Sequence, residues 1–320
     1  MRKKIRIGTR GSALAVWQAA GIKAEIEKKH SDVAIDIVII KTTGDKILDA
    51  PLHTIGGKGL FTKEIEEALL SQEIDLAVHS MKDVPTKFPD GLHLGAVTLR
   101  EDPRDVLLSR NGVRFNDLSL NAKIGTSSLR RQALLRHQRS DLVVEQVRGN
   151  VDTRIRKLKE GRFDAIVLAA AGVKRLGFEE YITEYLPLTW CIPAVGQGAL
   201  GIECRKNDSE INNVISFLND PVSRACVTAE RALLQRLEGG CQVPIGCYGR
   251  IESETLYVAG MVGSIDGHRL IRDSVQGSAE RAEELGTTLG EKLLSHGADV
   301  ILREIFMQGS PDRAGNSLDE

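Results

Sequence analysis

Several features that mark other classes of protein are scarce or missing in this chain of 320 residues. No apolar run approaches the about 18 residues that a membrane-spanning helix needs, and no apolar stretch follows the basic start, which argues against a secretory signal. Aromatic residues make up only 4% of the chain, so platforms for stacking nucleic-acid bases are few, and no reader motif is visible. These absences predict a cytoplasmic protein that binds neither a membrane nor nucleic acid.

Cysteine is also sparse, and the five cysteines are odd in number and lack the spacing of a metal site. We therefore expect reduced thiols and no metal. Cys241 differs from the others because it lies in Gly239-Gly240-Cys241-Gln242-Val243-Pro244, where glycines and a proline predict a tight, exposed turn. A thiol on such a turn can serve as a nucleophile or a covalent attachment point, or it can simply fill the turn.

The order of elements predicts an α/β protein. A strand over 5–9, a helix and a β-branched run over 33–41 form a β-α-β opening, and the run is typical of a strand buried on both faces. The same pattern resumes after a charged break at 101–105, and a hinge at 193–203 returns the chain to the first sheet. We expect two α/β lobes joined by crossover segments in a clam-shell plan, with a ligand between them, and a third, small α+β domain. The expected units are residues 1–98 with 199–218, residues 103–193, residues 221–308 and a disordered tail over 309–320.

Two segments of the first unit carry candidate chemistry. Residues 43–60 show little periodicity and have three glycines around Lys58, which favours a mobile active-site loop; the Lys-Ser/Thr ending of a P-loop is absent. The strand over 74–79 leads into Ser80-Met81-Lys82-Asp83-Val84-Pro85. Ligands of open α/β sheets bind beyond the carboxyl ends of the strands, so Asp83 stands where a catalytic carboxylate is expected. An aspartate that caps a turn before a proline is the alternative.

Basic residues are concentrated in the second unit. Between Lys123 and Arg175 there are 13 Lys or Arg against 5 Asp or Glu. Arg130 and Arg131 begin a helix, where a cation opposes the helix dipole, so they predict a bound anion beside Thr126 and Ser128. Arginines also recur after successive strand ends, which predicts a shared anion-binding cleft rather than a set of solvated surface residues. They are Arg10, Arg130, Arg131, Arg148, Arg154 and Arg175.

Five motifs in this order and spacing are highly specific. They are His79-Ser80-Met81-Lys82-Asp83-Val84-Pro85, Gly125-Thr126-Ser127-Ser128-Leu129-Arg130-Arg131, Arg148-Gly149-Asn150-Val151, Pro193-Ala194-Val195-Gly196-Gln197-Gly198 and Glu238-Gly239-Gly240-Cys241-Gln242-Val243-Pro244. With them the chain resembles the porphobilinogen deaminase (hydroxymethylbilane synthase) family over essentially its full length. The resemblance implies three domains, two of them like the lobes of periplasmic binding proteins. It also implies a monomeric transferase that joins four porphobilinogen molecules head to tail, releases ammonia each time and then releases hydroxymethylbilane.

The resemblance also implies a set of site residues. It implies a dipyrromethane cofactor held by a thioether to Cys241, a catalytic carboxylate at Asp83 and no metal. The implied cofactor-binding residues are Cys241, Lys82, Asp83, Ser80, Thr126, Ser128, Arg130, Arg131, Arg148 and Gly172. The implied substrate-binding residues are Arg10, Ser12, Lys58, Arg148, Arg154, Arg175 and Gln197.

The residues themselves fit this chemistry. Each pyrrole of the substrate carries an acetate and a propionate, and permanent planar cations suit such carboxylates. Asp83 can stabilise positive charge that develops on a pyrrole nitrogen, and it can move protons. Two other classes stay open at this point. A two-lobed carboxylate-binding protein shares the lobes and arginines but has no use for the Cys241 turn, and a cysteine-dependent acyl transferase needs a histidine base that the sequence does not place nearby.

Overall fold

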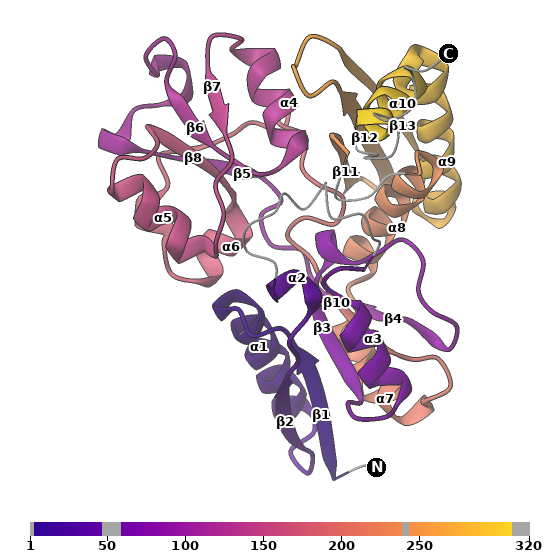
Figure 1. Ribbon diagram of the computed structural model, residues 1–320. Helices are drawn as coiled ribbons and strands as arrows, with labels where there is room; N and C mark the ends of the chain where they lie inside the picture. Colours follow the sequence, from indigo (N-terminus) through magenta and orange to yellow (C-terminus); the bar gives the residue numbers. More distant parts are fainter. Residues whose placement is uncertain (1–2, 47–58, 239–242, 309–320) are drawn as a thin grey trace, which may run out of the picture.

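The computed structural model describes residues 3–46, 59–238 and 243–308, and these residues form three sheets (Figure 1). The first lobe holds a five-stranded sheet of order β2-β1-β3-β10-β4. Helices α1 and α7 share a hydrophobic core on one face of this sheet, and α3 packs on the other. The elements of this lobe are β1 (Lys4–Thr9), α1 (Ala13–Lys29), β2 (Ala34–Ile39), α2 (Thr43–Lys46), α3 (Lys63–Leu70), β3 (Leu76–Ser80), β4 (Leu92–Val97), β10 (Leu200–Arg205) and α7 (Ser209–Ile215).

The second lobe repeats this plan with the sheet order β7-β6-β8-β5-β9. Helix α4 covers one face of the sheet, while α5 and α6 cover the other. The elements are β5 (Asp105–Ser109), β6 (Lys123–Gly125), α4 (Leu129–Gln138), β7 (Val143–Glu145), α5 (Val151–Lys159), β8 (Ala165–Ala169), α6 (Ala170–Arg175) and β9 (Glu184–Tyr185).

Each lobe receives one strand from a crossover. Strand β5, the first after the chain leaves lobe 1, runs antiparallel between β8 and β9. Strand β10, the first after the chain returns, runs antiparallel between β3 and β4. The two crossover segments, 98–104 and 193–199, therefore lie where the lobes meet. The two-lobed α/β class expected from the sequence is confirmed, while the unit boundaries stay predictions.

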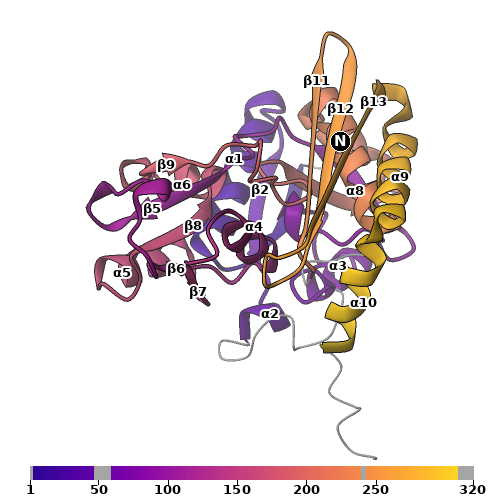
Figure 2. The same cartoon turned by 90° about the horizontal axis from the view of Figure 1, so that it is seen from above.

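The third unit is a three-stranded antiparallel sheet covered by helices, as Figure 2 shows from above. Helix α8 begins with Asp220 as its cap, whose carboxylate accepts from the amide of Ser223 at 2.7 Å, and with Pro221 in its first turn. The elements are α8 (Pro221–Arg236), β11 (Ile245–Glu252), β12 (Thr255–Gly263), β13 (Leu270–Ser278), α9 (Ala282–Leu293) and α10 (Asp299–Gln308).

Some sequence expectations need correction. The β-branched run over 33–41 forms β2, but β2 is an edge strand, and only Ile35 in it is buried, so the strand is not buried on both faces. Residues 43–46, expected as loop, form the short helix α2. Strand β11 and helix α10 were not expected; glycines interrupt the apolar pattern of β11, and Gly297, with φ of 97°, breaks the helical run before α10. The predicted tail over 309–320 lies outside the described residues.

Candidate active site

Ser80, Lys82 and Asp83 lie together because β3 ends at Ser80 and passes directly into a 3-10 turn over Met81–Asp83. The Ser80 hydroxyl contacts the side-chain amide of Gln18 on α1, at 2.9 Å from Nε2 and 3.2 Å from Oε1. Gln18 is buried, and its place on the inner face of a helix is the only feature of the sequence that could have indicated it. The strand and helix thus fix this turn at the carboxyl end of the sheet.

A pocket opens at this edge of lobe 1. Its wall comes from the ends of β1 and β3, the first turns of α1 and the segment before α3. The lining residues are Arg10, Ser12, Leu14, Ala15, Gln18, Phe61, Thr62, Val78, His79, Ser80 and Asp83. Four residues predicted from the sequence, Arg10, Ser12, Ser80 and Asp83, therefore line one pocket. Ser12 also caps α1, where its Oγ accepts from the amide of Ala15 at 3.3 Å.

Arg10 has partners within the protein. Its guanidinium pairs with the carboxylate of Asp45 on α2, with an Nη2–Oδ1 distance of 2.5 Å, and lies 4.1 Å from the ring centre of Phe61. Burial alone raises the pKa of Asp45, but hydrogen bonds from Arg10 and Thr42 hold that pKa below its usual value. A substrate carboxylate at Arg10 therefore has to share this guanidinium with Asp45 or displace it.

In lobe 2, the turn between β6 and α4 has the form that the sequence predicts for a helix N-terminus. Ser128 is the N-cap of α4, and its hydroxyl accepts from the amide of Arg131 at 3.4 Å. The Ser128 amide in turn donates to the Thr126 hydroxyl at 3.2 Å, and Thr126 is fully buried. These two side chains shape the turn that carries Arg130 and Arg131.

Arg130 and Arg131 bind a carboxylate that belongs to the protein. Both are buried, and their Nη atoms lie 2.8 Å and 2.7 Å from the two oxygens of Asp105, the first residue of β5. Burial disfavours the charged Asp105, yet these two cations depress the pKa of its carboxyl far below the usual range. The anion predicted beside Arg130 and Arg131 is thus the carboxylate of Asp105. A local sequence pattern cannot identify this partner, because it comes from another strand.

Gln197 and Arg175 also contact the protein. The side chain of Gln197 donates two hydrogen bonds from its Nε2, to the carbonyl of Pro103 at 2.7 Å and to Asp105 at 2.8 Å, and its Oε1 has no hydrogen-bond partner in the described part of the chain. Only that oxygen is left for a ligand. Arg175 donates to the carbonyl of Gly198 at 2.7 Å, so both residues brace the second crossover segment.

Gly172 lies where the lobes approach each other. It is buried in α6, and a Cβ atom built on it would meet the Leu14 side chain of lobe 1 at 3.6 Å. This is ordinary van der Waals contact, so the position marks a close approach of α6 to α1 rather than a polar contact.

Four cations from the two lobes act on one another electrostatically. Burial, together with the positive charges of Arg131 and Arg148, lowers the pKa of Arg154 to about 10. Burial also lowers the pKa of Lys82; Arg131 and Arg154 act in the same direction, whereas Asp83 opposes them. Lys82 of lobe 1 therefore shares an electrostatic field with the arginines of lobe 2. This excess of positive charge favours an anionic ligand with several carboxylates.

Two predicted residues, Cys241 and Lys58, lie outside the described residues. The other four cysteines are free and buried. Burial raises the pKa of Cys226 to about 11 and of Cys204 to about 12, and it raises those of Cys191 and Cys247 as well. A thiol must ionise to act as a nucleophile, so none of these four is suited to covalent chemistry.

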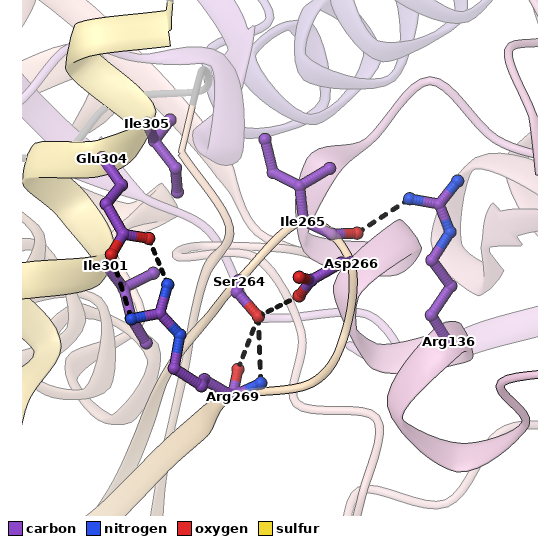
Figure 3. Close-up of a pocket in the computed structure, with 8 residues that line it drawn as sticks. All are labelled: Arg136, Ser264, Ile265, Asp266, Arg269, Ile301, Glu304 and Ile305. Atoms are coloured by element: carbon purple, nitrogen blue, oxygen red, sulfur yellow. Dashed lines mark hydrogen bonds and ion pairs between the residues drawn. The ribbon is translucent and has the colours of Figure 1, made fainter.

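A second pocket lies away from these residues, between α4, the turn joining β12 to β13 and α10 (Figure 3). Arg136 of α4 donates to the carbonyl of Ile265 in that turn at 2.8 Å, and Arg269 pairs with Glu304 of α10. The Arg136 bond thus joins the third unit to lobe 2, while the Arg269–Glu304 pair lies within the third unit. In the described ranges no group of acidic, histidine or cysteine side chains has the arrangement of a metal site, and no helix is long and apolar enough to cross a membrane.

Comparison with known proteins assigns the chain to a family. A model described as "Porphobilinogen deaminase, dipyromethane cofactor binding domain" matches residues 5–213, and one described as "Porphobilinogen deaminase, C-terminal domain" matches residues 224–295. A porphobilinogen deaminase of Geobacter metallireducens is 56% identical over 306 residues, 96% of each chain. Another, of Geobacter sulfurreducens, is 55% identical over 305 residues, 95% of this chain and 96% of that protein.

Among solved structures, the periplasmic aliphatic sulphonate binding protein SsuA from Escherichia coli matches with a TM-score of 0.40 and 16% identity, covering 74% of this chain and 71% of that one. That distant likeness carries no argument about function. The two family models together span most of the chain, and the Geobacter proteins match it almost from end to end. The chain belongs to the porphobilinogen deaminase family.

Proposed function

We propose that this chain is a porphobilinogen deaminase, a transferase that joins four porphobilinogen molecules head to tail with loss of ammonia and releases hydroxymethylbilane for tetrapyrrole biosynthesis. Family membership supports this proposal, and so does one local observation. Lys82, Arg131, Arg148 and Arg154 share an electrostatic field beside Asp83. A growing chain of pyrroles brings many carboxylates into one cleft, and such a set of cations can balance them.

The residues present fit the family's dipyrromethane cofactor, which we assign to a thioether on Cys241. The Nε atoms of Arg130 and Arg131 are buried without a hydrogen-bond partner in the described residues, although Asp105 binds one Nη atom of each. Buried donors of this kind are normally satisfied, so a bound carboxylate or an ordered water is expected beside them. When bound, dipyrromethane supplies the pyrrole carbon to which the first substrate unit is joined.

Asp83 is the proposed catalytic residue. One of its carboxylate oxygens accepts a hydrogen bond from the pyrrole N–H of the substrate and so stabilises the positive charge that develops as the amine departs. The carboxylate also takes up the proton released from the attacked carbon. Arg10 and Ser12, which line the pocket with Asp83, bind the carboxylates of the incoming substrate. Arg148, Arg154 and Arg175 hold those of the units already joined, and Lys58 and Gln197 complete the proposed set.

The proposal extends to a monomeric enzyme that works in the cytoplasm without nucleic acid. The four described cysteines are free, which suits a reducing compartment. Light scattering should give the mass of a single chain, cell fractionation should recover the protein with cytoplasmic markers, and a DNA or RNA oligomer should not change the mobility of the protein. A dimer would contradict the proposed monomer, and a periplasmic location would contradict the proposed cytoplasmic one. A stable complex with the oligomer would contradict the proposed absence of a nucleic-acid partner.

The intact mass of the purified, denatured protein tests the tether first. The wild-type protein should carry an added mass equal to two linked pyrrole units, and Cys241→Ser should lack it. Cys226→Ser, which changes a buried thiol on α8, is the matched control and should keep it. If none of the three proteins carries an added mass, the wild-type protein is incubated with porphobilinogen. An unloaded enzyme then gains mass on Cys241, whereas a carboxylate-binding protein gains none.

A further inference from the structure

Arg231 of α8 binds the backbone that directly follows Asp83. Its Nη1 donates to the carbonyl of Val84 at 3.2 Å, and its Nη2 donates to the carbonyls of Pro85 at 2.7 Å and Thr86 at 3.1 Å. Three successive carbonyls on one guanidinium fix the direction in which the chain leaves the Asp83 turn. A planar fork of donors suits this task better than a single ammonium group.

The cation is half-buried and has no carboxylate partner in the described residues. In the described part of the chain no acidic side chain lies within ion-pair distance of Arg231, and its remaining contact is with the ring of Phe88, whose centre is 5.4 Å away. Burial lowers the pKa of its guanidinium to about 10, with the charge of Arg224 acting in the same direction and that of Glu203 opposing it. Burying a charge is costly unless it is well hydrogen-bonded, so the three carbonyl bonds must compensate for this burial. The contact is therefore not an incidental surface bond.

The same face of α8 packs against the turn itself. Val227, one helical turn before Arg231, shares a small hydrophobic cluster with Met81 and Val84, the residues that flank Lys82 and Asp83. The amide of Val84 also donates to the carbonyl of Met81 at 3.2 Å, which closes the turn. Asp83 thus lies on a turn held by apolar contact and by the guanidinium, both from one helix.

Helix α8 is also the element from which the segment with Cys241 departs, because it ends at Arg236. Its position is tightly set by α9: a Cβ atom on Gly286 would lie 2.0 Å from the carbonyl oxygen of Ala229. Figure 1 shows α8 between lobe 1 and the rest of the third unit. One rigid helix therefore contacts the turn of the catalytic carboxylate and leads to the cofactor attachment segment.

We propose that Arg231 is a positioning residue that fixes the Asp83 carboxylate relative to the helix leading to the cofactor cysteine. This inference rests on the proposed function, since it requires that Asp83 catalyses and that Cys241 carries the cofactor. The proposed role of Arg231 involves no contact with substrate or cofactor. Small displacements of a catalytic group, on the order of 1 Å, can lower the rate by about 10²-fold, so such a residue affects kcat more than binding.

Arg224 provides a matched control on the same helix. It is also half-buried, and its Nη atoms likewise donate to two backbone carbonyls of lobe 1, those of Leu94 at 3.1 Å and Gly95 at 2.9 Å. Burial lowers the pKa of its guanidinium too. The difference is that its carbonyls belong to strand β4 and not to the Asp83 turn. Removing Arg224 tests docking of α8 on lobe 1 without removing any hydrogen bond to the backbone of the turn.

The experiment compares Arg231→Gln and Arg224→Gln with the wild-type holoenzyme. Intact mass gives cofactor loading, thermal unfolding gives stability, and initial rates give kcat and KM for porphobilinogen. We expect both variants to be loaded and to lose stability, but only Arg231→Gln to lose about tenfold or more in kcat, with KM within about threefold of wild type. Equal kcat values in the two variants would reduce Arg231 to a docking residue and overturn the inference.

Two further variants keep the result interpretable. Arg231→Lys retains the cation but cannot hold three carbonyls with a planar fork, so kcat should fall to an intermediate value; full kcat in that variant would overturn the inference even if Arg231→Gln fails to fold. Asp83→Asn distinguishes a failure of the proposed function from a failure of the positioning role of Arg231. If Asp83→Asn is as active as wild type, the proposed function fails at Asp83, whereas an inactive Asp83→Asn beside a fully active Arg231→Gln rejects only the positioning role.

Discussion

The carboxylate of Glu230 and the guanidinium of Arg100 form a buried ion pair, with an Nη1–Oε1 distance of 2.5 Å. The same carboxylate accepts hydrogen bonds from the backbone amides of Gly196 at 2.6 Å and Gly249 at 2.7 Å. Arg100 lies in the first crossover segment, Gly196 in the second and Gly249 in β11. One side chain of α8 thus joins both connections between the lobes to the third unit.

Glu230→Gln should strongly destabilise the protein. The change removes the charge that balances buried Arg100, and breaking a buried pair in this way typically costs about 3–5 kcal/mol. The control is Glu284→Gln, which breaks the exposed pair with Arg281 and should have little effect. Urea unfolding of both variants measures the free energies. Similar values for the two would mean that the Glu230 pair is solvated and does not join the crossovers.

Asp83→Asn should retain the fold and the loaded cofactor but lose about 10²-fold or more in kcat, because the amide can neither take up a proton nor balance positive charge. Asp90→Asn, an exposed aspartate a few residues further on, is the control and should be as active as wild type. Rates with porphobilinogen and intact masses make the comparison. A fully active Asp83→Asn would remove this carboxylate from the mechanism.

Arg154→Gln should weaken function while raising stability. Arg154 is repelled by Arg131 and Arg148, so its removal relieves a like-charge penalty in the free protein. The same change leaves fewer cations for the substrate carboxylates, so KM should rise by about tenfold, the effect of about 1.4 kcal/mol. Arg156→Gln, on the exposed side of the same helix, is the control. Unchanged KM in Arg154→Gln would place Arg154 outside the binding cleft.

The sequence could predict the type and order of most elements because local patterns determine them. The strand that ends at Ser80, the helix N-terminus at Ser128 and the return strand β10 all follow from periodicity and turn chemistry. The edge position of β2 could not be predicted, because β-branched content favours a strand but does not say how many neighbours it has.

The partners of the site residues could not be predicted from the sequence either. Asp105 lies 25 residues before Arg130 in the chain, and Asp45 lies 35 after Arg10, yet each is in ion-pair contact with that arginine. Only the folded topology brings such groups together. The sequence therefore predicted which arginines follow the strand ends, but not that protein carboxylates already occupy part of their binding capacity.

A buried acidic group behind the pocket gives the chain a pH-dependent stability. Glu66 on α3 is buried, and its Oε1 atom has no hydrogen-bond partner in the described residues. Nearby, His79 and Glu203 form a buried pair with an Nε2–Oε2 distance of 3.0 Å. Burial raises the pKa of Glu66 above its ordinary value of 4.5, and the negative charge of Glu203 raises it further.

The sign of the effect follows from this direction. The folded protein holds the Glu66 proton at pH values where the unfolded chain has lost it, so the stabilising contribution is complete below pH 4.5 and is lost as the pH rises through the raised pKa. Glu66→Gln cannot ionise and avoids this loss, so its unfolding temperature relative to wild type should rise between pH 5 and pH 8. Glu67→Gln, at an exposed neighbour, should show no such trend. If the difference between Glu66→Gln and wild type does not grow with pH, Glu66 is ionised in the folded protein and has a compensating partner.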